Sequence, residues 1–312
     1  ITLSDGRILI PGGGRASVEI YNPKSKKWRP TGSMSVDRGV LQAVKLPGDR
    51  VLVAGGYGGS GSNRYLRSAE IWSPDSGRWR ATGSMTTERA TFAMVKLDDG
   101  RVLAIGGIQL GNIPLRSAEI YDPETEQWVA TSPMAHARYS HGAVSLRNGK
   151  VLVAGDASSA HTPTAELFDP TTETWKTVGS LAAWRSRSPM TLLADGRVLM
   201  AGGAGPNASK AETYDPASKT WTLGSGSMAE PRFRASAARL ADGRVLFAGG
   251  EDSAGLRPEA EVFDPSDGSW TRTDRMTQYR NGPTATAIKG GKVLLVGGGT
   301  ATAEVFRPRQ QR

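Results

Sequence analysis

The sequence predicts an all-β fold, a propeller of four-stranded antiparallel blades, and two observations lead to it. The first is internal repetition: a turn, a short apolar strand and a glycine pair, as in residues 99–107 (DGRVLAIGG), recur seven times at a period of 43 to 51 residues. The second is fixed spacing, because a proline stands five residues before a tryptophan in six units. A constant frame of this length indicates stacked supersecondary units.

Each repeat unit accounts for four strands, as the third unit illustrates. Residues 91–95 form the first strand, and an Asp-Gly turn joins it to the apolar strand 102–105 as a two-residue hairpin, since this dipeptide tolerates positive φ. The third strand, 119–121, ends at Asp122-Pro123 because proline cannot extend a sheet ladder, and Trp128 marks the fourth strand. No segment repeats its apolar residues every 3.6 positions, so we expect essentially no helix.

We expect residues 1–312 to form a single propeller domain. Its units lie near residues 1–34, 35–85, 86–134, 135–181, 182–228, 229–276 and 277–312. Nearly all the length variation falls between the glycine pair and the next glutamate, which predicts one variable loop per unit. The last unit stops before any tryptophan, and the first unit holds only three residues of its first strand. We therefore expect an incomplete last blade, a weakly closed ring and further residues upstream of Ile1.

The glycine pair, the aromatic residue of the third strand and the tryptophan recur together across six units, and in this the sequence resembles kelch repeats. The resemblance covers practically the whole chain, and it extends to bacterial kelch proteins and to the central domain of galactose-oxidase-like proteins. It implies a seven-bladed β-propeller with one blade per unit. It also implies that a strand from the opposite terminus often completes the last blade.

Composition limits the classes of function. The chain has no cysteine, which excludes disulfides, thiol nucleophiles and thiolate metal sites, and no apolar run is long enough to span a membrane. The net charge of +9 favours an anionic partner. Much of this charge recurs at fixed repeat positions, so we expect no nucleic-acid partner. The compartment stays open, with an extracellular or periplasmic location favoured.

Six arginines stand at equivalent positions where the inner strand begins, on the same face as the variable loops. They are Arg38, Arg89, Arg138, Arg185, Arg232 and Arg280. Converging guanidinium groups suit a carboxylate, sulfate or phosphate, because the planar fork donates two parallel hydrogen bonds. Since they recur in every blade, the alternative is a scaffold role, paired with a carbonyl or with a glutamate that also occurs once per blade. Those glutamates are Glu19, Glu70, Glu119, Glu166, Glu212, Glu261 and Glu304.

Residues that break the repeat are better candidates for a binding site. Arg187 and Arg234 are additional arginines in the fifth and sixth units, and three aromatic residues stand beside repeated arginines, namely Tyr139, Trp184 and Phe233. The longest loop contributes Tyr57, Asn63, Arg64 and Tyr65. An aromatic ring beside an arginine can stack on a sugar or on a peptide side chain. Ordinary loop packing would also explain any one of these residues.

Three histidines, His136, His141 and His161, fall near the start and the variable loop of the fourth unit, where Asp156 replaces the second glycine of the pair. Imidazole and carboxylate groups bind copper, zinc or iron, so these histidines are the metal candidates. His136 and His141 are not at a chelating spacing, and we expect no cofactor. The cysteine-modified tyrosine of galactose-oxidase-like enzymes is excluded because the chain has no cysteine.

The expected function is a non-enzymatic binding module that presents an arginine-rich loop face to an acidic protein segment or an anionic glycan. The alternative is an enzyme acting on a small sugar-like or acidic substrate at the mouth of the propeller channel. Such an enzyme would be metal-dependent near the histidines, or metal-free with Glu251 or Asp252 as the base. A structural module of a larger secreted protein is the third hypothesis.

Overall fold

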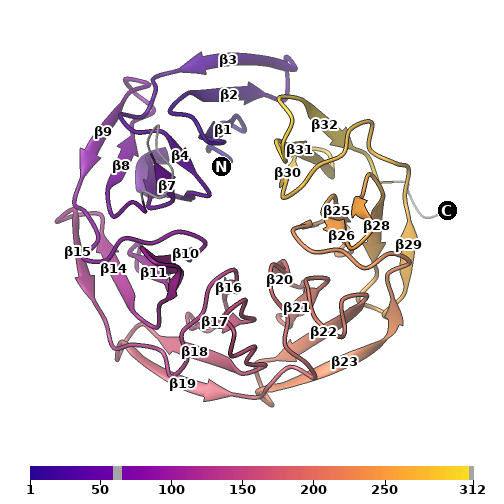
Figure 1. Ribbon diagram of the computed structural model, residues 1–312. Coiled ribbons are helices and arrows are strands. Elements are labelled where there is room, and N and C mark those ends of the chain that lie inside the picture. The colour runs from indigo at the N-terminus through magenta and orange to yellow at the C-terminus, as the bar shows by residue number, and fades with distance from the viewer. Residues whose placement is uncertain (59–64, 309–312) are drawn as a thin grey trace. The chain divides into compact units, whose positions relative to one another are not determined.

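The computed structural model describes residues 1–58 and 65–308. The chain is an all-β, seven-bladed β-propeller of antiparallel blades, as the repeats predict (Figure 1). It divides into two compact units. Unit 1 consists of Ile1–Ser145, Gly149–Val151 and Leu167–Lys176, and unit 2 of Leu146–Asn148, Leu152–Glu166 and the chain from Thr177 onward. Among the described residues, no helix has the length and apolar character needed to cross a membrane.

The strands of each blade follow one another in the chain. Blade 1 has β1 (Ile8–Pro11), β2 (Val18–Asn22) and β3 (Lys27–Thr31). Blade 2 has β5 (Gln42–Lys45), β6 (Val51–Ala54), β8 (Ala69–Trp72) and β9 (Trp79–Thr82), with a 3-10 turn, η1, at Pro47–Asp49. Blade 3 has β10 (Ala93–Lys96), β11 (Val102–Ile105), β14 (Ala118–Asp122) and β15 (Gln127–Ala130). Blade 4 has β16 (Gly142–Ser145), β17 (Val151–Ala154), β18 (Ala165–Asp169) and β19 (Thr174–Val178).

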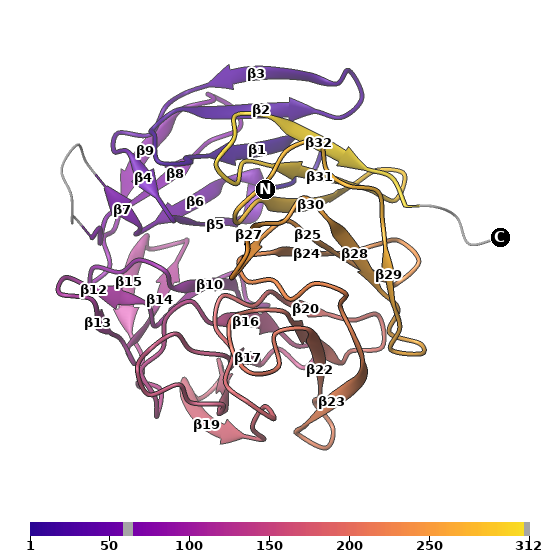
Figure 2. The ribbon, with the colours of Figure 1, turned by 45° about the vertical axis from the view of Figure 1, so that its right-hand side comes forward.

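The remaining blades continue the pattern. Blade 5 has β20 (Met190–Leu192), β21 (Val198–Ala201), β22 (Lys210–Asp215) and β23 (Thr220–Ser227). Blade 6 has β24 (Ser236–Arg239), β25 (Val245–Ala248), β28 (Ala260–Phe263) and β29 (Trp270–Arg272). Blade 7 has β30 (Thr284–Ile288), β31 (Lys292–Val296) and β32 (Ala303–Phe306), so the described part of the last blade has three strands, as predicted. Figure 2 shows β23 and β29 at the outer edges of blades 5 and 6.

The turn between the first two strands is one residue longer than the expected two-residue hairpin. In blade 3 the Gly100 N–H donates to the Leu97 carbonyl at 3.1 Å, and the Leu97 N–H donates to the Arg101 carbonyl at 2.8 Å. Gly100 takes φ 93°, which leaves a three-residue loop with glycine at the left-handed position. The Asp99 carboxylate accepts the Arg101 N–H at 3.0 Å and the Arg101 Nε at 2.8 Å, which accounts for the repeated Asp-Gly-Arg triplet.

The core lies between neighbouring blades, because the second strands of blades 2 to 6 are covered on both faces. In β6, β11, β17, β21 and β25 all four residues are buried. This is why these strands are continuous apolar runs and do not alternate. The aromatic residue of the third strand pairs directly with the tryptophan of the fourth, as Tyr121 does with Trp128 at 5.1 Å between ring centroids.

Three short sheets outside the blades position the candidate site. We call two segments of each blade by name. The lead-in segment runs from the methionine or leucine that ends one unit to the first strand of the next blade. The 2–3 loop lies between the second and third strands. The small sheets are β4 (Arg38–Gly39) with β7 (Tyr57–Gly58), β12 (Ile108–Gln109) with β13 (Ile113–Pro114), and β26 (Glu251–Asp252) with β27 (Gly255–Leu256). The β4–β7 pair joins a lead-in segment to the 2–3 loop of the same blade, so both lie at one end of that blade.

Candidate binding site

The six repeated arginines are buried inside the blades. Each has a relative exposure of 0%, and five of them pair with the glutamate on the third strand of their own blade. These ion pairs are Arg38–Glu70 at 3.1 Å, Arg89–Glu119 at 2.7 Å, Arg185–Glu212 at 2.9 Å, Arg232–Glu261 at 2.8 Å and Arg280–Glu304 at 3.1 Å. Arg138 is equally buried. The ligand-binding role expected for these side chains is therefore corrected to a structural one, because a guanidinium without solvent exposure cannot meet a ligand.

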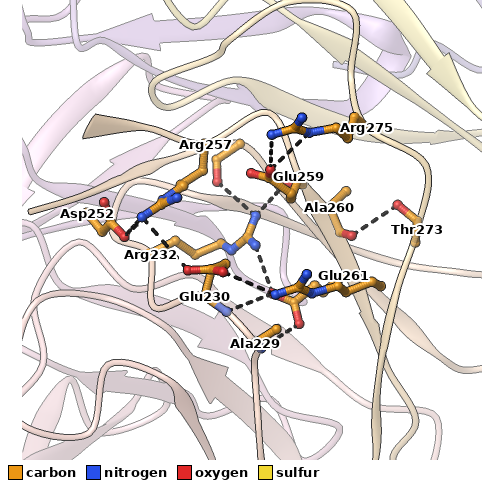
Figure 3. A network of polar contacts seen from close by, with 12 residues as sticks. Ala229, Glu230, Arg232, Asp252, Arg257, Glu259, Ala260, Glu261, Thr273 and Arg275 are labelled. Carbon is orange, nitrogen blue, oxygen red and sulfur yellow. Dashed lines mark hydrogen bonds and ion pairs between the residues drawn. The ribbon is translucent and has the colours of Figure 1, made fainter. Parts of the chain in front are cut away.

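Blade 6 shows how one pair fixes the lead-in segment (Figure 3). Arg232 Nη2 donates to Glu261 Oε1 at 2.8 Å, and Arg232 Nη1 donates to the Glu259 carbonyl at 2.5 Å. The second carboxylate oxygen of Glu261 accepts the backbone N–H of Ala229 at 2.8 Å. Burial lowers the pKa of the Arg232 guanidinium, and the Glu261 carboxylate opposes that shift. The lead-in segment is thus held by its backbone and by its arginine to the same carboxylate.

The repeated glycines connect one blade to the next. In blades 2 to 6 the N–H of the second residue of the pair donates to the carbonyl of the arginine in the following blade, as Gly250 does to Arg280 at 2.7 Å. Gly249 has φ 70°, and a Cβ there would lie 2.6 Å from the Arg280 carbonyl oxygen. Asp156 keeps the same bond, to the Arg185 carbonyl at 2.8 Å, and its buried carboxylate accepts the Ser158 N–H at 2.7 Å.

Arg187 and Arg234 stand two residues after repeated arginines, at a turn that projects side chains outward. Both adopt left-handed backbone angles, with φ 52° and 57°, and the Arg234 N–H donates to the Arg187 carbonyl at 2.9 Å. The equivalent residues Val40, Thr91 and Ser140 also have φ between 50° and 52°, so this left-handed turn is a feature of the repeat. The Arg234 side chain is 45% exposed and its Nη1 lies 3.0 Å from Glu251 Oε1.

The guanidinium of Arg187 has no carboxylate partner among the described residues. Its Cζ lies 6.0 Å from the ring centroid of Phe233, within the range of a cation–π contact. Phe233 is held by a bridge to Glu251 of its own 2–3 loop. The contact between Arg187 and Phe233 therefore joins blades 5 and 6, both of which lie in unit 2.

Trp184 lies on the same lead-in segment as Arg187. The Trp184 ring centroid is 4.1 Å from that of the exposed His161. The 2–3 loop of blade 5 packs on the Trp184 backbone, since a Cβ on Gly205 would lie 2.2 Å from the Trp184 carbonyl oxygen. Trp184 is partly exposed. We call Trp184, Arg187, Phe233 and Arg234 the arginine–aromatic cluster.

The tyrosines form a separate cluster in unit 1. The rings of Tyr57 and Tyr65 lie 4.9 Å apart, and the Tyr65 hydroxyl donates to Asn112 Oδ1 at 2.5 Å. Burial and a hydrogen bond with Tyr65 raise the pKa of Tyr57 to about 12, with a smaller contribution from Tyr139. Asn112 was not among the expected residues, because its contact with Tyr65 joins two different variable loops. Asn63 and Arg64 lie outside the described residues.

The histidines do not form a metal centre. His136 is exposed, His161 stacks on Trp184, and both ring nitrogens of His141 are buried without a hydrogen-bond partner among the described residues. Burial, with the nearby Arg138 and Arg89 charges, lowers the pKa of His141 to about 3, so its ring is neutral. Within residues 1–58 and 65–308, no group of three or more histidine, cysteine or acidic side chains could hold a metal ion.

The carboxylates considered as metal-free bases are bound by arginines. Glu251 pairs with Arg234, and Asp252 accepts Arg257 Nε at 2.9 Å (Figure 3). Burial raises the pKa of Asp252, but hydrogen bonds from Arg257 and from the Ala254 N–H leave it below its usual value. A base poised near neutral pH needs the opposite shift.

The Kelch motif matches residues 46–86 and 97–135 of the chain. Over 91 residues the chain is 30% identical to Kelch-like protein 23 of Mus musculus and 29% identical to Kelch-like protein 23 of Homo sapiens. The match covers 29% of this chain, and the chain spans about 16% of the length of these two relatives.

Two solved structures share the fold. A fungal alcohol oxidase of the AA5 family, determined in complex with copper, superposes with a TM-score of 0.76 over 95% of this chain and 68% of that chain, at 19% identity. YjhT superposes with a TM-score of 0.68 over 86% of this chain and 95% of that chain, at 13% identity. The Kelch motif in two units and the seven-bladed fold together support a kelch β-propeller.

Proposed function

We propose that this propeller is a binding module that takes an acidic protein segment at the arginine–aromatic cluster of blades 5 and 6. The observation that carries the proposal is the partly exposed guanidinium of Arg187, which has no carboxylate partner among the described residues and faces the ring of Phe233. A peptide carboxylate would supply the missing anion and accept two parallel hydrogen bonds from the planar fork.

The charge balance around blade 6 favours a peptide over a sulfated glycan. Arg234 pairs with Glu251, Arg272 with Glu230 and Arg275 with Glu259, so these guanidinium groups are already compensated. A densely charged glycan binds by neutralising many free cations, whereas these three described arginines are already paired. A peptide needs one carboxylate at Arg187 and an apolar side chain on Phe233 or Trp184, where aromatic rings provide contact area.

The test is fluorescence anisotropy with a fluorescein-labelled peptide that alternates glutamate and leucine. Arg187→Asn should weaken binding roughly tenfold, the order expected for a charged hydrogen bond in a partly exposed site. Asparagine tolerates the left-handed backbone at this position, so the variant should keep its melting temperature. Raising the salt concentration should weaken binding in the wild type and much less in the variant.

The matched control is Arg272→Gln, an exposed arginine on the outer strand β29 of blade 6, which should bind the peptide as the wild type does. Equal affinities for the wild type and Arg187→Asn would refute the proposal. A heparin-type oligosaccharide that binds while the peptide does not would assign the face to a glycan. Stoichiometric copper binding would favour an enzyme.

A further inference from the structure

The blades of unit 2 carry a cavity at the end where the first and second strands turn, away from the lead-in segments and the 2–3 loops. Its volume is about 450 Å³, and we call it the blade 6–7 notch. Apolar side chains of Leu240, Ala241, Ala287 and Ile288 line it, and Arg239 and Lys292 contribute the cations. The notch is therefore an apolar pocket with positive charge.

The repeat shows that Lys292 differs from its equivalents. A cation follows the turn in all seven blades, and six of the seven pair with a carboxylate. The pairs are Arg7–Asp5, Arg50–Glu126, Arg101–Asp99, Lys150–Asp169, Arg197–Asp195 and Arg244–Asp242. The turn of blade 7 reads Lys289-Gly290-Gly291 and has no aspartate, and Lys292 has no carboxylate partner among the described residues. The last blade thus leaves unpaired the charge that the other blades compensate.

The equivalent position between blades 1 and 2 shows which group fits there. The Asp49 carboxylate accepts the Ser4 N–H at 2.8 Å, the Ser4 hydroxyl at 2.7 Å and the Lys45 Nζ at 2.9 Å. These hydrogen bonds hold the pKa of Asp49 at about 2. In blade 2 this end of the blade therefore holds a carboxylate between two donor side chains.

Blade 7 has Gly291 at the position of Asp49 and therefore carries no carboxylate there, and glycine also stands at this position in the other five blades. The strand registers make Ala287 equivalent to Lys45, because Ala287 pairs with Val293 and Lys45 pairs with Val51, the first apolar residue of each second strand. Gly291 is then equivalent to Asp49. A Cβ added to Gly291 would meet nothing closer than the Ala241 Cβ at 3.6 Å, which leaves room for an additional group.

Arg239 provides a second cation at the same place. It ends β24, is exposed, and has no carboxylate partner among the described residues. The carboxylate of Asp242, which also lines the notch, is bound by Arg244 through Nε at 2.9 Å and Nη2 at 2.7 Å. The positive charge of Arg239 and Lys292 is therefore available to a ligand.

We propose that the blade 6–7 notch binds an organic carboxylate with a short branched apolar tail. Arg239 and Lys292 contact the carboxylate, and the tail packs on Ala241, Ala287 and Ile288. This site is independent of the arginine–aromatic cluster, so either proposal can fail without the other. The ligand is a free acid or the carboxyl terminus of a polypeptide, which have the same chemistry.

The test is isothermal titration calorimetry with isovalerate, and with isoamyl alcohol as the uncharged analogue. Isovalerate should bind and the alcohol should not. Lys292→Met and Arg239→Gln should each weaken isovalerate binding roughly tenfold, as expected for loss of one charged contact. The matched control is Lys289→Met, which removes an exposed lysine of the same turn that does not line the notch and should leave affinity unchanged.

Gly291→Asp provides a second, gain-of-charge test. It places in blade 7 the residue that blade 2 has at this position, where Asp49 already takes a left-handed backbone, so the variant should fold. Its carboxylate would lie toward Ala241 and Ala287, the equivalents of the Ser4 and Lys45 that contact Asp49, and should abolish isovalerate binding by repelling the ligand carboxylate.

N-acetylleucine and its uncharged amide, N-acetylleucinamide, distinguish the two sources of the carboxylate. If N-acetylleucine binds more tightly than isovalerate and the amide does not bind, the ligand is a polypeptide carboxyl terminus. Otherwise the ligand is a free acid. The proposal is overturned if isovalerate does not bind, or if the alcohol binds equally well. Unchanged affinity in Lys292→Met and Arg239→Gln would overturn it too.

Discussion

Replacing Glu212 by glutamine should unfold the protein at a markedly lower temperature, because it leaves the Arg185 charge buried without its counter-charge. Both side chains have 0% exposure, and the Glu212 carboxylate accepts Arg185 Nε at 2.9 Å and the Ala182 N–H at 2.7 Å. The amide of a glutamine has one acceptor and one donor end. Either orientation places its NH₂ group against Arg185 or against the Ala182 N–H.

The magnitude follows from the burial. Breaking a buried ion pair by removing one partner costs about 3–5 kcal/mol, because the remaining charge stays desolvated. At about 2 °C per kcal/mol for a chain of this size, the melting temperature should fall by roughly 6–10 °C.

The assay is thermal unfolding followed by tryptophan fluorescence and by circular dichroism. The matched control is Asp195→Asn in the same blade, where the Arg197–Asp195 pair is 40% and 48% exposed. An exposed pair contributes at most about 1 kcal/mol, so the control should lose no more than about 2 °C. A shift of the same small size for Glu212→Gln would refute the assignment of the repeated arginines to the scaffold.

Three further predictions concern stability. The folded state holds the pKa of Asp49 at about 2, below its usual 3.8, so Asp49→Asn should destabilise the protein at pH 7. In melting experiments the difference in stability between the variant and the wild type should shrink as the pH falls from 3.8 to about 2. Because the pKa of His141 is lowered to about 3, unfolding takes up a proton below pH 6.5, so the wild type should lose up to about 1.4 kcal/mol per pH unit in acid denaturant titrations. His141→Leu, which introduces the residue that blade 2 has at the equivalent Leu41, should remove that dependence, and an unchanged pH profile would contradict it. Gly249→Ala should lower the free energy of unfolding in urea by roughly 2 kcal/mol or more, since φ is 70° and the new Cβ would lie 2.6 Å from the Arg280 carbonyl oxygen. Gly290→Ala, which has open space around its Cβ, should lower it less.

Sequence periodicity was sufficient for the architecture, because the interactions that define a blade are local. Each strand pairs with the next one along the chain, the glycine pair and the proline mark strand ends, and the tryptophan faces the aromatic residue directly across the ladder. The apolar runs of the second strands became strands that are buried on both faces. The turn was misjudged by one residue, since an Asp-Gly pair serves both two- and three-residue loops.

The exposure of each arginine was decided by the tertiary structure. Arg185, one of the six repeated arginines, and Arg187 are the same residue type two positions apart. Glu212 and the loop carbonyls enclose Arg185, whereas the left-handed turn directs Arg187 outward. The residues that bury or pair a charge come from other strands and other blades. Whether Lys292 has a counter-charge, whether Tyr65 meets Asn112 and whether three histidines meet one another all depend on such distant contacts. Short-range pattern specifies which strands form, whereas the environment of a charge depends on which of those strands pack together.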